Sequence, residues 1–132
     1  MVLDTSAIVA ILLREREHDA FAALLADAED PIISAATLLE ASIVMQTKTG
    51  DAGVAALDEL LAAASVRCAA VDHQQAITAR EAYSRCGKGR SAAALNFGDC
   101  FVYALAHIQV RPLLFKGTDF SRTGVEPADH AI

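Results

Sequence analysis

The sequence predicts an α/β fold in which helices cover both faces of a mostly parallel sheet, with right-handed crossovers between strands. Short apolar runs alternate with segments of helical spacing along the chain. The length of 132 residues favours one domain over residues 1–132. Hydrophobic residues make up 54% of the chain, and much of this fraction is alanine, which favours helix and argues against disorder.

Each expected strand is a short apolar run bounded by polar or turn-forming residues. The first run, MVLD, is followed by Thr5 and Ser6, either of which can cap the next helix. Pro31 interrupts a helical pattern and opens the second run, whereas Gly117 ends the last run. The expected strands cover residues 1–4, 31–33, 66–71 and 112–116.

Helices are expected where apolar residues recur at helical spacing behind a capping residue. Ser34 can cap the helix that contains Glu40, and Gly50 ends that helix. Asp72 and Asn96 can cap two later helices, and the segment between these helices, CGKGRSAAAL, is expected to be a loop. The expected helices cover residues 7–13, 17–28, 35–49, 52–65 and 73–85, and a further helix follows Asn96.

Three aspartates are expected near the carboxyl edge of this sheet, where parallel α/β folds bind their ligands. Asp4 follows the first strand, Asp119 follows the last strand, and Asp99 opens a helix. Each also has a local explanation. Asp4 can favour a helix N-terminus, Asp119 can serve in a turn, and Asp99 can complete a capping box with Asn96.

Glu40 lies in an otherwise apolar helical segment, ISAATLLEASIVM. None of its neighbours one turn away is basic, so no local ion pair explains the charge. These neighbours are Ala36, Thr37, Ile43 and Val44. Two interpretations remain at this point. Either Glu40 faces solvent while Leu38, Leu39 and Ile43 face inward, or it is a carboxylate on a buried face, which is costly unless it is paired or binds a metal.

Several carboxylates that converge repel one another, by about 4 kcal/mol per pair at ~4 Å with an effective dielectric constant near 20. Such a cluster persists only when protons or cations neutralise it. Oxygen ligands without clustered His or Cys suit Mg²⁺ or Mn²⁺ rather than Zn²⁺. A carboxylate-held Mg²⁺ binds phosphates and activates water, so this interpretation favours phosphodiester or phosphoryl chemistry.

Other classes of protein lack their signatures here. The chain contains no phosphate-binding GxxxxGK[ST] loop, no GxGxxG dinucleotide motif and no GxSxG nucleophile elbow. Its three cysteines form no CxxC pair, its longest apolar runs are too short to span a membrane, and its N-terminus lacks the basic region of a signal peptide. A reducing cytoplasm is therefore the expected location.

The net charge of −6 argues against nucleic-acid binding through overall charge. A local basic cluster nevertheless lies before Asp99, and it is either a solvated helix end or a contact surface for a phosphate backbone. Its members are Arg80, Arg85, Lys88 and Arg90.

Four segments together resemble the PIN-domain ribonucleases, and more closely the VapC toxins of bacterial VapBC toxin–antitoxin modules. These segments are DTSA, SAATLLEAS, LNFGDCFVYALA and PLLFKGTDF. The resemblance implies a Rossmann-like α/β/α sandwich, a Mg²⁺- or Mn²⁺-dependent endoribonuclease activity, a homodimer, and inhibition by a cognate VapB antitoxin. Its acidic positions match Asp4, Glu40, Asp99 and Asp119, and relatives often carry an acidic or amide residue where this chain has Thr118.

The resulting hypothesis assigns a role to each candidate residue. Asp4 and Asp99 would bind one metal directly, and Glu40 would bind it directly or through water. Asp119 would hold a second metal or orient the attacking water. Phosphate or water contacts are expected from Thr5, Ser6 and Thr118, and contacts with the RNA backbone from Arg85, Lys88 and Arg90.

Three alternatives stay open at this point. A signalling receiver domain also uses an α/β sheet, Mg²⁺ and a lysine after a late strand, where this chain has Lys116. A dehalogenase-like phosphatase needs a second aspartate at the position of Ser6. A PIN-fold module without activity would act through its partner alone.

Overall fold

The sheet of the computed structural model, which describes residues 1–87 and 95–128, has four strands that are all parallel. The strands are β1 (Val2–Leu3), β2 (Ile32–Ser34), β3 (Arg67–Ala69) and β4 (Leu113–Leu114), and their order is β3-β2-β1-β4. The prediction of an α/β fold with a parallel sheet is therefore confirmed, although each strand but β2 is shorter than the apolar run that predicted it.

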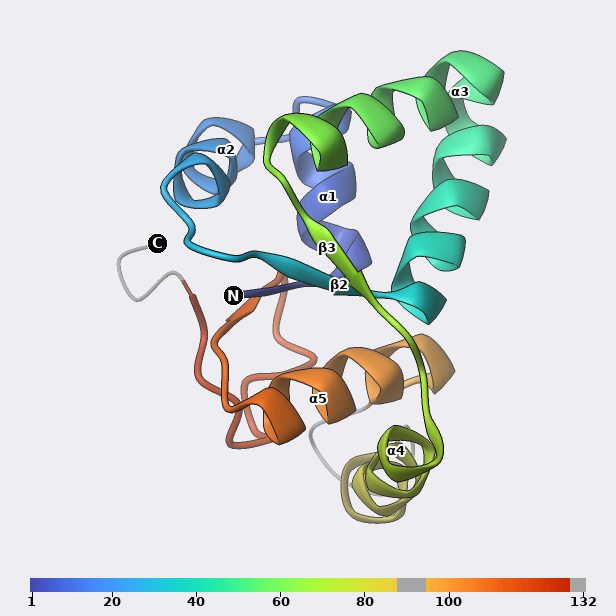
Figure 1. The fold of residues 1–132 in the computed structure, drawn as a ribbon, viewed down its shortest axis with the longest axis vertical. Coiled ribbons are helices and arrows are strands. Elements are labelled where there is room, and N and C mark those ends of the chain that lie inside the picture. The colour runs from blue at the N-terminus through green and yellow to red at the C-terminus, as the bar shows by residue number, and fades with distance from the viewer. Residues whose placement is uncertain (88–94, 129–132) are drawn as a thin grey trace.

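The predicted helices are present with small changes at their ends. They are α1 (Thr5–Leu12), α2 (His18–Ala26), α3 (Ala35–Ala63), α4 (His73–Cys86) and α5 (Phe97–Gln109). Helix α3 contains the two helices expected over residues 35–49 and 52–65, which meet at a break at Gly50 (φ 68°, ψ −156°). Because this backbone conformation is open essentially to glycine alone, Gly50 sets the sharp change of direction seen in Figure 1.

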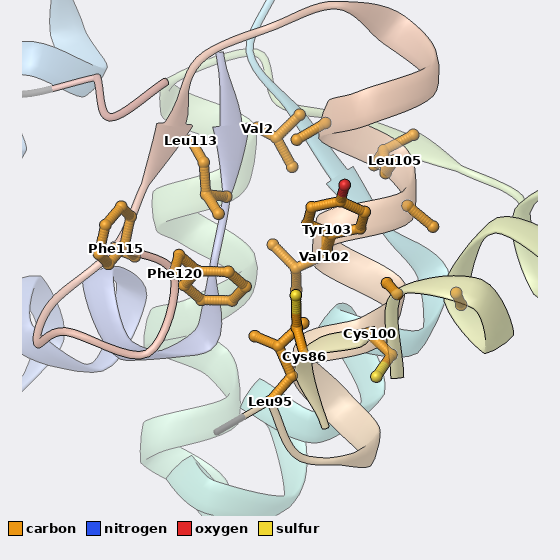
Figure 2. Packing of buried hydrophobic residues seen from close by; sticks show 14 of the residues in the cluster. Val2, Cys86, Leu95, Cys100, Val102, Tyr103, Leu105, Leu113, Phe115 and Phe120 are labelled. Carbon is orange, nitrogen blue, oxygen red and sulfur yellow. The ribbon is translucent and has the colours of Figure 1, made fainter. Parts of the chain in front are cut away.

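The sheet separates two hydrophobic cores, and successive strand residues point into different ones. Leu3, Ile33 and Leu114 pack with α1, α2 and α3, whereas Val2, Ile32 and Leu113 pack with α4 and α5. Figure 1 shows the same division of the helices between the two faces. In the second core, Val2 and Leu113 face α5 at Val102 and Leu105, and Phe120 closes one side (Figure 2). This arrangement confirms the predicted three layers.

The strand order changes direction at β1. The chain moves from β1 outward to β2 and β3, and later returns to place β4 on the other side of β1. In parallel sheets, the crevice outside the carboxyl ends of the strands at such a switch point is the usual binding site. The residues that follow β1 and β4 therefore lie where a ligand is expected.

The opposite edge of the sheet is held by Asp30, which precedes β2. Its carboxylate accepts hydrogen bonds from Arg67 Nε and Nη2 at 3.3 and 3.1 Å, and from Arg111 Nη2 at 2.6 Å. Arg111 also donates to the backbone carbonyl of Asp30 at 2.6 Å. These contacts join the amino ends of β2, β3 and β4, and the two guanidinium groups lower the pKa of Asp30 to about 2.

Within residues 1–87 and 95–128, none of the helices combines the length and hydrophobicity needed to cross a membrane.

Gly87 and Leu95 form a parallel bridge at the two ends of the loop expected over residues 86–95, whereas the interior of that loop lies outside the described residues.

We predict that Asp30→Asn lowers the melting temperature by a few degrees at pH 7, because the substitution removes the charge that both arginines bind. Asparagine tolerates the positive φ of 46° at this position, so the backbone is retained. Since the pKa is lower in the folded state, the stabilisation is present above about pH 4 and is lost as the pH falls through about 2. The wild-type and variant melting curves should therefore converge in acid.

Asp58→Asn, on the exposed side of α3, is the matched control and should leave the melting temperature unchanged. Equal stability of the wild type and Asp30→Asn at pH 7 would contradict the assignment of a stabilising ion-pair cluster.

Candidate active site

A cavity of about 370 Å³ opens at the carboxyl ends of β1 and β4. Five carboxylates and one lysine contribute to its lining. The full lining consists of Asp4, Thr5, Ser6, Val9, Glu15, Glu40, Val44, Asn96, Asp99, Lys116, Asp119 and Phe120. The four carboxylates selected from the sequence thus meet at this cavity. Asp4 follows β1, Glu40 lies on α3, Asp99 lies on α5, and Asp119 lies in the segment after β4.

Asp4 directly follows β1 and caps α1. Its carboxylate accepts a hydrogen bond from the backbone N–H of Ser6 at 3.0 Å and another from the Ser6 hydroxyl. The expectation that Thr5 or Ser6 caps this helix was wrong, because both belong to the helix and Asp4 is the capping residue. Only 5% of Asp4 is exposed, and this burial raises the pKa of its carboxyl group.

Asp99 both completes the capping box of α5 and lines the cavity. Its carboxylate accepts the Asn96 N–H at 2.9 Å, and the Asn96 side chain accepts the Asp99 N–H at 2.9 Å, so the predicted capping box is confirmed. The same carboxylate lines the cavity. Burial, followed by the charges of Asp4, Asp119 and Glu40, raises the pKa of Asp99 to about 6 against the opposing hydrogen bond from Asn96.

Glu40 projects from α3 into the same cavity and accepts a hydrogen bond from the Thr5 hydroxyl. The interpretation in which Glu40 faces solvent while Leu38, Leu39 and Ile43 face inward is wrong, although Leu38 itself does pack against the core formed with α1, α2 and α3. Leu39 and Ile43 are 62% and 57% exposed, whereas Glu40 is half-buried. The helix is therefore rotated so that its carboxylate faces the cavity and these two apolar side chains face outward.

Lys116 lies at the rim of the cavity and is bound by acidic residues that follow α1. Its ammonium lies 2.5 Å from Glu15 Oε2 and 3.2 Å from Glu17 Oε2. Its backbone N–H donates to Ser6 Oγ at 2.9 Å, so the segment after β4 supports the hydroxyl that in turn binds Asp4. This pairing could not be predicted from the sequence, because Glu15 and Lys116 are 101 positions apart.

The remaining candidates are placed differently. Asp119 lines the cavity, whereas Thr118 is exposed and is not part of the lining. Arg85 lies on α4 and donates to the Tyr103 hydroxyl at 3.1 Å, away from the cavity lining. Lys88 and Arg90 lie outside the described residues. The proposed contacts of this basic cluster with RNA therefore stay a prediction.

The donor set suits a hard cation, because the facing ligands are carboxylate oxygens without histidine or cysteine. Burial is the main cause of the raised pKa of the Asp99 carboxyl, and the nearby carboxylates of Asp4, Asp119 and Glu40 raise this pKa further. In the described part of the chain, however, no three His, Cys, Asp or Glu side chains are already arranged as a metal site.

Comparison with known proteins agrees with this geometry. The family model for the PIN domain matches residues 1–126. The chain belongs to the PIN-domain family. It is also 50% identical to "Ribonuclease VapC" of Mycolicibacterium smegmatis over 127 residues, which are 95% of this chain and 97% of the relative.

Other relatives place the chain in the VapC group of PIN-domain proteins. "Ribonuclease VapC30" of Mycobacterium tuberculosis is 45% identical over 125 residues, with 95% of each chain covered. The crystal structure of VapC20 of M. tuberculosis, described as a sarcin–ricin loop cleaving toxin, superposes with a TM-score of 0.77 over 94% of this chain and 95% of that chain. At 20% identity, this likeness shows the shared PIN fold alone.

We predict that Asp99→Asn stabilises the metal-free PIN domain by about 1–2 kcal/mol at pH 7.5, after allowance for solvent screening of the pKa shift. The amide oxygen can still accept the Asn96 N–H, while the charge that is costly to bury is removed. A folded-state pKa of about 6 lies above the ordinary value, so wild-type stability falls as the pH rises through 6. The stability difference between the variant and the wild type should therefore shrink as the pH falls from about 6 to about 4.

Urea unfolding in a chelator at several pH values measures this difference. Asp72→Asn is the matched control, because Asp72 caps α4 by accepting the Gln75 N–H at 2.8 Å and does not line the cavity. A loss of stability in Asp99→Asn at pH 7.5 would show that capping outweighs charge burial at this position.

Proposed function

We propose that this chain is a VapC-type toxin that hydrolyses RNA internally with Mg²⁺ or Mn²⁺ bound at the acidic cavity. The observation that carries the proposal is the convergence of Asp4, Glu40 and Asp99 in one cavity of a PIN-domain chain. Its curated relatives are named ribonucleases. Membership in the PIN-domain family sets aside the receiver and phosphatase alternatives.

Asp4 and Asp99 would hold the cation directly, and Glu40 would hold it directly or through water. When bound, such an ion polarises a phosphate and lowers the pKa of an attacking water. The protein contributes orientation, since Ser6 fixes Asp4 and Asn96 fixes Asp99 before any substrate arrives. Asp119, which lines the same cavity, would orient the water or hold a second ion.

Family membership also supports two partners for this chain. One is a cognate VapB antitoxin that inhibits it in the cytoplasm. The other is a second copy of the chain. Leu39 and Ile43 on α3 and Phe97 at the start of α5, which is 80% exposed, offer exposed apolar side chains on two helices that contact each other. Such exposed side chains at neighbouring positions are typical of interfaces.

We predict that Asp99→Asn lowers RNA cleavage by at least a hundredfold in Mg²⁺ while the protein stays folded, because a ligand charge is lost without a change in size. Millimolar Mn²⁺ should raise the melting temperature of the wild type more than that of the variant, since an ion that binds only the folded state stabilises it. Cleavage of a mixed RNA pool and thermal melting measure the two effects.

Asp72→Asn again serves as the control and should cleave RNA as the wild type does. Wild-type protein that folds and binds Mn²⁺ but cleaves no RNA would favour a PIN-fold module without activity. Cleavage by Asp99→Asn at the wild-type rate would overturn the assignment of this residue.

We predict that Ile43→Lys together with Leu39→Lys shifts the protein from dimer to monomer, because charges in the proposed apolar interface would be buried without partners. Sedimentation velocity measures the change. Phe101→Lys would be a poorer test of the dimer, because the Phe101 ring packs edge-on against Phe97 within α5, with ring centroids 4.9 Å apart, and its loss would also disturb the monomer. A wild type that sediments as a monomer would contradict the dimer proposal.

A further inference from the structure

Glu40 is confined between two residues that have no acidic or basic group of their own. On one side, the Thr5 hydroxyl of α1 donates a hydrogen bond to Glu40 Oε1. On the other side, a Cβ atom built on Gly98 of α5 would lie 2.1 Å from Glu40 Oε2 and 3.0 Å from its Cδ. The carboxylate therefore occupies space that only a glycine at position 98 leaves free.

The backbone conformation at position 98 does not require a glycine. Gly98 lies in the first turn of α5, and among the glycines of residues 1–87 and 95–128 those with positive φ are Gly50, Gly117 and Gly124. Glycine is among the poorest residues for a helix, so the position favours alanine on propensity alone. The close approach of the Glu40 carboxylate is the feature of the described structure that alanine would disturb.

We infer that Thr5 and Gly98 are positioning residues that direct the Glu40 carboxylate toward the metal ligands Asp4 and Asp99. Thr5 follows Asp4 in the chain and Gly98 precedes Asp99, so the two contacts fix Glu40 relative to both aspartates. Outer contacts that orient a metal ligand commonly change affinity or activity about 10–100-fold when they are removed. The inference rests on the proposed function.

The first test compares Thr5→Val with Thr5→Ser. Valine keeps the branched shape and removes the hydroxyl, whereas serine keeps the hydroxyl, so the pair isolates the hydrogen bond to Glu40. We expect Thr5→Val to weaken Mn²⁺ binding, measured by isothermal titration calorimetry, and kcat by about tenfold each. Thr5→Ser should recover most of both losses, and KM for RNA should change little in either variant.

The second test is Gly98→Ala, which adds one methyl group against the Glu40 carboxylate. Because the group that must move is the end of a flexible side chain, the metal-free variant should melt at the wild-type temperature or above it. Its Mn²⁺ affinity should nevertheless fall by about tenfold. A lower melting temperature with unchanged Mn²⁺ affinity would instead indicate a merely structural glycine.

A double-mutant cycle separates action through Glu40 from any other effect. If Gly98 acts through Glu40, Gly98→Ala should not weaken Mn²⁺ binding further in a Glu40→Ala background. A full additional loss there would overturn the inference for Gly98, and wild-type behaviour of both Thr5→Val and Gly98→Ala would overturn it altogether. A wild type that neither binds Mn²⁺ nor cleaves RNA would instead refute the proposed function itself, and the inference with it.

Discussion

The position of Asp4 is the constraint on which the rest of the site depends. This residue directly follows β1 and caps α1, and the backbone N–H and hydroxyl of Ser6 fix its carboxylate at the switch point. Lys116 N–H supports that hydroxyl from the segment after β4. The strand, the helix and the returning segment are therefore joined at the first acidic residue, and the other cavity carboxylates are arranged around it.

The burial of acidic residues at the cavity lowers the stability of the fold. Each carboxylate has its own local partners, namely Ser6 for Asp4, Asn96 for Asp99 and Thr5 for Glu40. The hydrogen bonds to Asp4 and Asp99 favour the charged forms of these two carboxyl groups, yet burial still raises the pKa of both. Burial of the Asp4 and Asp99 carboxyl groups thus makes their charged forms costly, and the proposed cation would offset that cost.

The sequence was sufficient for the features that depend on local pattern. Alternation of strands and helices predicted the parallel sheet, and the capping box at Asn96 and Asp99 followed from spacing alone. The rotation of α3 was not predictable, because Leu39, Glu40 and Ile43 could each face inward by composition. The pairing of Lys116 with Glu15 was equally hidden, since only the tertiary fold brings residues so distant in sequence together.

The break at Gly50 determines where the chain can return to the sheet. An uninterrupted helix of 29 residues would extend about 44 Å, roughly three times the radius of gyration expected for a domain of this size. A straight helix of this length would carry the chain far past the position of β3, which lies next to β2. At Gly50 the chain changes direction, and the part of α3 after Gly50 leads back toward β3. The part of α3 before Gly50, which carries Glu40, can therefore lie along the cavity while the part after it completes the crossover to β3.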